Sequence, residues 1–137
     1  MIASSEPVRA ENPAPCILLA EDETMLRMVM ADTLRDAGYE ISEAKDGADA
    51  LAVLESGAAI DLLIADIRMP RMDGYQLTIR ALERNPQLKV LLVTGYASEP
   101  LPERLRALKV PVLHKPFDFD KLVEIVKSLL DSRERIS

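Results

Sequence analysis

Polar side chains that can do chemistry follow four short apolar runs of this 137-residue chain. They are the acidic run Glu21-Asp22-Glu23 and, further along the sequence, Asp66, Thr94 and Lys115. If the fold brings these residues together, several carboxylates stand close to one another. Two like charges about 4 Å apart at an effective dielectric near 20 cost roughly 4 kcal/mol. We therefore expect positive charge at the same point, supplied by Lys115 and by a divalent cation that oxygen ligands hold.

A carboxylate, a hydroxyl, an ammonium group and a metal ion around one point can transfer phosphoryl groups. The carboxylate of Asp66 can act as the nucleophile and form an aspartyl phosphate. Mg²⁺ suits such a site, because it binds one or two carboxylates together with phosphate oxygens and keeps several waters. The ion and the lysine stabilise the charge that develops on the phosphoryl oxygens. Taken alone, Asp66 could equally be a plain carboxylate that caps the turn after a strand.

Short apolar runs alternate with segments of helical periodicity along the chain. Runs of this length favour strands that are buried on both faces. The expected strands are Cys16–Ala20, Tyr39–Glu43, Asp61–Asp66, Leu88–Thr94 and Val110–His114. The expected helices begin at Thr24, Asp46-Gly47, Gly74, Pro100 and Asp118, and they end near Gly38, Gly57, Arg84, Leu108 and Leu130.

This strict alternation predicts an α/β fold with a parallel sheet, right-handed crossovers and helices on both faces. Five strand–helix units fit a doubly wound sheet in the order 2-1-3-4-5. In such a sheet, ligands bind at the carboxyl ends of the strands, where the first strand lies beside the third. We expect Glu21, Asp22, Asp66, Thr94 and Lys115 to gather at that edge.

Four motifs, in order and each at the end of an expected strand, resemble those of the receiver domain of bacterial two-component response regulators. The resemblance spans residues 16–131, and it implies the flavodoxin-like, five-stranded fold expected above. The matching segments are Ile17–Glu23, Asp66–Gly74, Val93–Gly95 and His114–Phe117.

The resemblance implies a role for each residue of the acidic cluster. Asp66 would be the phosphoacceptor. Asp22 would be the main metal carboxylate, with Glu21 as the second acidic residue, acting directly or through water. Asp66 and the backbone carbonyl of Arg68 would complete the metal shell around Mg²⁺.

The resemblance also implies how the phosphoryl group is held. Thr94 would donate its hydroxyl to the phosphoryl group, and Lys115 would pair with it. A cis peptide bond before Pro116 would aim Lys115 at the site.

Two positions depart from the pattern of this family. Glu21 stands where Asp is common, which lengthens the carboxylate by one methylene. Val112 stands where many receivers have a Tyr or Phe that acts as a switch. The side chain of Val112 is too short to act as this switch. We therefore expect that Tyr96 and the weakly helical segment up to Leu108 change conformation on phosphorylation.

Composition limits the classes of partner. The chain has 23 Asp and Glu against 17 Lys and Arg, and this net charge of −6 disfavours nucleic acid and anionic membranes. Its single cysteine, Cys16, excludes an intrachain disulfide and fits a cytoplasmic location. No apolar run is long enough to span a membrane, and no signal peptide is recognisable. We divide the chain into a flexible arm (1–15), a receiver domain (16–132) and a short tail (133–137).

The expected function is that of a receiver that accepts a phosphoryl group onto Asp66. The donor would be the phosphohistidine of a sensor histidine kinase or of a histidine phosphotransfer protein. The output would be contact with an unknown protein, or relay of the phosphoryl group, by a monomer or weak homodimer. Apart from self-phosphorylation and self-dephosphorylation, we expect no enzymatic activity. Met1 and the short tail favour a stand-alone chain over a receiver fragment of a hybrid histidine kinase.

Other interpretations stay open at this point. A haloacid dehalogenase-type phosphatase or phosphotransferase would have an Asp two residues after the nucleophile, where this chain has Arg68. A flavin or nucleotide binder would need a Gly- or Ser/Thr-rich loop in place of the acidic run. His114 is interpreted as structural. Met25, Met28 and Met30 are interpreted as helix packing, with a partner-binding face as the alternative.

Overall fold

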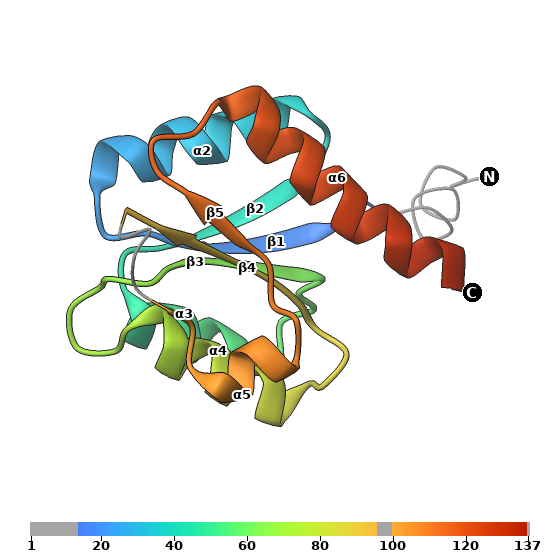
Figure 1. Ribbon diagram of the computed structural model, residues 1–137. Coiled ribbons are helices and arrows are strands. Elements are labelled where there is room, and N and C mark those ends of the chain that lie inside the picture. The colour runs from blue at the N-terminus through green and yellow to red at the C-terminus, as the bar shows by residue number, and fades with distance from the viewer. Residues whose placement is uncertain (1–13, 96–99, 137) are drawn as a thin grey trace.

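The computed structural model, which describes residues 14–95 and 100–136, contains a five-stranded parallel sheet (Figure 1). The strands run parallel in the spatial order β2-β1-β3-β4-β5. This order confirms the predicted doubly wound, flavodoxin-like fold. The strands are β1 (Cys16–Ala20), β2 (Glu40–Ala44), β3 (Leu62–Asp66), β4 (Lys89–Thr94) and β5 (Val112–His114).

In the part of the chain that the structure describes, five helices cover the two faces of the sheet and give a three-layered arrangement (Figure 1). Helices α2 and α6 lie on one face, and α3, α4 and α5 lie on the other. The helices are α2 (Thr24–Asp36), α3 (Gly47–Glu55), α4 (Gly74–Arg84), α5 (Glu103–Ala107) and α6 (Phe119–Ile136). In the described part of the chain, no helix is long and apolar enough to cross a membrane.

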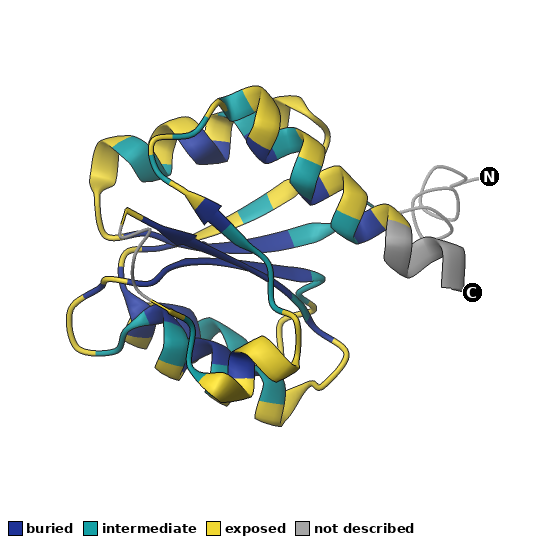
Figure 2. Cartoon of the chain, in the orientation of Figure 1, coloured by how far each residue is buried: buried dark blue, intermediate teal, exposed yellow. Residues whose placement is uncertain are grey.

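The sheet divides the apolar interior into two cores, because alternate side chains of a strand point to opposite faces. Leu18 and Leu63 pack in the core beneath α3, α4 and α5, whereas Leu19 and Ile64 pack beneath α2 and α6. Every residue of β3 is buried, as the dark central strands of Figure 2 show. Burial of one such side chain contributes roughly 1.5–3 kcal/mol, so the central strands form a rigid base for the residues at their ends.

Most strands differ from the predicted bounds by one residue, β5 begins two residues later than predicted, and the helices show further differences. Helix α2 begins at Thr24 as predicted, with Glu23 in the cap position, and the Glu23 side chain makes no capping hydrogen bond. Helix α5 begins only after Pro102, whose carbonyl accepts the first bonds of the helix. Helix α6 continues to Ile136, so the predicted tail is helical over most of its length. No Pro or Gly follows residue 131 to stop it.

Candidate functional site

Two buried carboxylates meet where β1 and β3 end side by side. Glu21 follows the last residue of β1, and Asp66 is the last residue of β3, the strand that pairs with β1. Glu21 is only 1% exposed and Asp66 only 5%. The neighbouring Asp22 is exposed, and one carboxylate oxygen from each of the three residues lies within 4.8 Å of the others. The structure thus brings together the acidic cluster that the sequence predicts.

Lys115 reaches the same point from the end of β5. Its Nζ atom lies 2.9 Å from Oδ2 of Asp66 and 3.4 Å from Oε1 of Glu21. The backbone N–H of Lys115 donates to the carbonyl oxygen of Thr94 at 2.7 Å, which fixes the start of the loop beside the end of β4. The Lys115–Pro116 peptide bond is cis, as the resemblance implies.

Burial and the charges of the cluster shift the pKa values of Glu21 and Lys115. Burial raises the pKa of Glu21 from 4.5 to about 7, and the charge of Asp66 adds to this effect. The N–H of Glu23, which donates to Glu21 Oε2 at 3.0 Å, and the charge of Lys115 act in the opposite direction. Burial lowers the pKa of Lys115, but its hydrogen bond to Asp66 and the charges of both carboxylates outweigh burial, so the pKa is raised. The cluster therefore favours an additional positive charge.

The loop between β3 and α4 holds the backbone close to Asp66. The N–H of Arg68 donates to Oδ1 of Asp66 at 3.3 Å, so the Arg68 backbone lies at the site. A Cβ atom on Gly74 would lie 2.5 Å from the carbonyl oxygen of Asp66, and the N–H of Gly74 donates to the carbonyl of Ile67. Only glycine allows so close an approach. Asp73 then caps α4 in a reciprocal capping box with Gln76.

A brace that the sequence did not reveal ties this loop to α3. The Arg71 guanidinium bonds to the carboxylate of Asp46 at 2.6 Å, and Asp46 also caps α3 by accepting from the N–H of Asp49. These two donors hold the pKa of Asp46 below its usual range. A Cβ atom on Gly47 would lie 2.2 Å from the carbonyl oxygen of Met72, so α3 packs directly on the loop. The helix and the loop are thus fixed to each other.

Arg27 is a second residue that sequence reasoning missed. Its Nη1 donates to the carbonyl oxygen of Glu21 at 2.9 Å, and its Nε bonds to Oε1 of Glu43 at 3.2 Å. It thereby ties the turn after β1 to α2 and β2. Neither partner stands at a helical or strand spacing from Arg27, so local periodicity carries no signal for this contact.

The remaining predicted residues occupy different surroundings. Thr94 is buried at the end of β4, in register with His114, which is exposed. Val112 is half-buried at the start of β5 and packs against the core beneath α3, α4 and α5. Tyr96, the predicted switch residue, lies outside the described residues.

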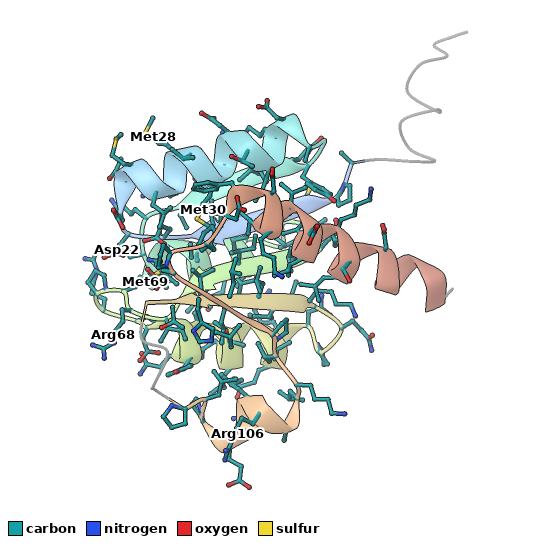
Figure 3. The ribbon with its side chains drawn as sticks, turned by 45° about the horizontal axis from the view of Figure 1, so that its top comes forward. Asp22, Met28, Met30, Arg68, Met69 and Arg106 are labelled. Carbon is teal, nitrogen blue, oxygen red and sulfur yellow. The ribbon has the colours of Figure 1, made fainter. Side chains whose placement is uncertain are left out.

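The methionines of α2 do not all pack inside, so their interpretation as helix packing is wrong in part. Met30 is buried, but Met25 is 71% and Met28 50% exposed, and Val29 beside them is 43% exposed. Figure 3 shows Met28 on the outer side of α2 and Met30 toward the sheet, with Asp22 near the start of the helix. The buried residues of α2 lie from its midpoint, Met30, onward. The first turns of the helix therefore present an apolar patch, Met25, Met28 and Val29, next to the acidic cluster.

The donor set of the cluster fits a hard divalent cation. Its ligand atoms are carboxylate oxygens, which such cations prefer over nitrogen or sulfur. Burial, together with the charge of Asp66, raises the pKa of Glu21 despite the presence of Lys115, so a further cation would favour the ionised carboxylate. Glu21, Asp22 and Asp66 can therefore hold a metal ion at the carboxyl edge of the sheet, where a doubly wound fold binds its ligands.

Comparison with known proteins agrees with this geometry. A family model described as the response regulator receiver domain matches residues 17–127, and the chain belongs to this family. The response regulator receiver protein CpdR of Brucella abortus is 38% identical over 115 residues, which cover 83% of this chain and 95% of CpdR. The sensor kinase CckA of the same organism is 35% identical over 120 residues, or 86% of this chain, but these cover only 13% of CckA.

Solved structures give the same assignment. A CheY-like response regulator receiver domain from Methanospirillum hungatei matches with a TM-score of 0.81 and 28% identity, covering 90% of this chain and 99% of that one. The receiver domain of the hybrid histidine kinase CckA matches with a TM-score of 0.72 and 40% identity, covering 84% and 98%. The predicted resemblance to two-component receivers is confirmed, and the chain is a response regulator receiver.

Proposed function

We propose that Asp66 accepts a phosphoryl group from the phosphohistidine of a sensor histidine kinase or of a histidine phosphotransfer protein. The observation that carries the proposal is the buried Asp66 carboxylate, which lies 2.9 Å from an ammonium group and beside two further carboxylates. A buried carboxylate in such a cluster needs a positively charged environment, and a phosphoryl-transfer site needs the same environment. The similarity to CpdR and to the receiver domain of CckA supports this reaction class.

The reaction exchanges one bond for another. A carboxylate oxygen of Asp66 forms a bond to phosphorus as the phosphorus–nitrogen bond of the phosphohistidine breaks. The electron pair of that bond stays with the leaving imidazole, which takes a proton from solvent. Lys115 is close enough to the carboxylate to neutralise charge on the transferred group, and the Arg68 N–H orients the Asp66 carboxylate.

We assign the cation site to Mg²⁺, held by the carboxylates of Glu21, Asp22 and Asp66 and by the backbone carbonyl of Arg68. When bound, the ion supplies positive charge that stabilises the phosphoryl oxygens. The all-oxygen donor set and the raised pKa of the buried Glu21, whose ionised form a cation would favour, support the assignment. Arg27 holds the turn that carries Glu21, so that the carboxylates do not have to be ordered when the ion binds.

For the protein to signal, phosphorylation must also change the conformation of a surface that a partner protein binds. We propose that the hydroxyl of Thr94 donates to a phosphoryl oxygen and draws the end of β4 toward Asp66. Val112 is part of the core packing and has no aromatic ring that could change its position. The conformational change is therefore transmitted by Tyr96 and the short helix α5. On this proposal, amide exchange changes across residues 94–108 when a phosphoryl mimic binds, and Tyr96→Ala separates phosphorylation from partner binding.

The apolar patch of Met25, Met28 and Val29 suits the docking of the protein that carries the phosphohistidine. It is continuous with the site, because α2 begins two residues after Asp22. A pocket of about 500 Å³ lies between α2 and the segments that follow β4 and β5, and it is lined by Leu26, Gly95, Lys115, Pro116, Phe117 and Phe119. A donor that covers both surfaces excludes water from the transferred group.

The proposal is tested by incubation with acetyl phosphate and Mg²⁺, followed by measurement of the intact mass. Wild-type protein should gain the mass of one phosphoryl group, and the gain should disappear in Asp66→Asn and in EDTA. Asp131→Asn, which removes an exposed carboxylate from α6, is the matched control and should be labelled like the wild type. Unchanged labelling of Asp66→Asn would refute the assignment.

A further inference from the structure

A groove lies at the edge of the sheet opposite to Asp66. Its walls come from α4 and α5 and its floor from the segments that lead into β4 and β5, with a volume of about 630 Å³. Lys89 is the first residue of β4, whereas the phosphoacceptor site stands at the carboxyl ends of the parallel strands. The groove is therefore separate from the site described above. Leu82, Leu105, Val110 and Leu129 give it an apolar lining.

An exposed apolar side chain extends this lining to the surface. Leu108 is 56% exposed and lines the groove at the end of α5. It is one of four large apolar side chains that are strongly exposed in the described part of the chain, and the other three form the patch on α2. A large exposed leucine next to an apolar depression suits the binding of apolar side chains from a second molecule.

The rim of the groove is basic in a protein that is acidic overall. Its lining contains Lys89, Arg104 and Lys109 but only one acidic residue, Glu83, whereas the whole chain has a net charge of −6. Arg104 pairs with Glu83 at 3.7 Å across the groove. Among the described residues, the ammonium groups of Lys89 and Lys109 form no ion pair. The local charge therefore favours a negatively charged occupant.

We infer that this groove binds an acidic, amphipathic segment of a partner protein. Apolar side chains on one face of the segment would fill the lining next to Leu108, and carboxylates on its flanks would face Lys89 and Lys109. Nucleic acid fits less well, because no aromatic side chain lines the groove for base stacking. The chain's own residues 1–13 carry two Glu and one Arg, too little negative charge to match the rim.

The interaction is tested by fluorescence anisotropy with a labelled synthetic peptide that has Leu on one helical face and Glu on the other. A second peptide with Lys in place of each Glu is the charge control. The full chain should bind the acidic peptide and not the basic one. Binding should weaken about fivefold in the double variant Lys89→Gln/Lys109→Gln, the size expected for two exposed charge pairs.

Two further variants separate the groove from general charge and from folding. Leu108→Gln should weaken binding without loss of stability, since the side chain is exposed. Lys121→Gln/Lys127→Gln, which removes two exposed lysines from α6, should bind like the wild type. Equal binding of both peptides, or equal weakening by both lysine pairs, would overturn the inference. So would tighter binding of duplex DNA, or self-association that Leu108→Gln abolishes, because the occupant would then be nucleic acid or a second copy.

Discussion

Removal of the charge on Glu21 should stabilise the metal-free protein at alkaline pH. The carboxyl group is buried beside Asp66, and its pKa is about 7 in the folded protein instead of 4.5. The folded state therefore holds the proton more tightly than the unfolded state. The stability that this proton provides is fully present below pH 4.5, and it is lost as the pH rises through 7.

The size of the effect follows from the two pKa values. One pKa unit corresponds to 1.36 kcal/mol, so the change from 4.5 to about 7 is worth at most about 3 kcal/mol. Most of this loss falls between pH 5 and pH 8. Glu21→Gln has no such proton to lose, and its side-chain oxygen can still accept from the N–H of Glu23. Its free energy of unfolding should match that of the wild type at pH 5 and exceed it at pH 8 by about 2 kcal/mol.

Urea denaturation in EDTA at these two pH values measures the difference. Glu23→Gln makes the same chemical change at an exposed position, and it should show no such dependence on pH. Saturating Mg²⁺ should narrow the gap at pH 8, because the cation offsets the charge that the variant removes. A difference between Glu21→Gln and the wild type that is equal at pH 5 and pH 8 would refute the reasoning.

The brace and the close approach at Gly74 give further predictions. Asp46→Ala should lower the free energy of unfolding by about 1–3 kcal/mol, because it removes both the cap of α3 and the partner of Arg71. Arg71→Ala should lower the free energy of unfolding by less than about 1 kcal/mol, because Asp46 keeps its bond to Asp49 and Arg71 is largely exposed. Urea denaturation of both variants measures these changes, and an equal loss of stability in the two variants would contradict the account. Gly74→Ala should destabilise by about 1–3 kcal/mol and slow phosphorylation by acetyl phosphate, since the new Cβ atom would clash with backbone. The exposed change Ser128→Ala on α6 is its control and should leave both quantities unchanged.

The sequence predicts the sheet and the ends of its strands because both are local properties. β1 and β3 are buried on both faces and appear as unbroken apolar runs. Once their order is known, the residues that follow them must meet at one edge. This is why Glu21, Asp66 and Lys115 could be brought together from spacing alone.

The contacts that brace the site could not be predicted in the same way. Arg71 and Asp46 are 25 residues apart, and both look like ordinary surface residues of turns. Their pairing depends on how closely α3 packs on the loop after β3, a distance that Gly47 permits but that no periodicity specifies. Helical spacing likewise identified an apolar face on α2. It could not show that the first turns, with Met25 and Met28, lie where nothing in the described part of the chain covers them.

The central claim is that Asp66 carries the phosphoryl group, and chemical trapping tests it most directly. Borohydride reduces an aspartyl phosphate to homoserine, so reduction after incubation with acetyl phosphate and Mg²⁺ marks the acceptor permanently. Peptide mass spectrometry should then find homoserine at position 66 and unmodified Asp at position 22. Homoserine at position 22, or phosphate retained on His114 with Asp66 unchanged, would contradict the account.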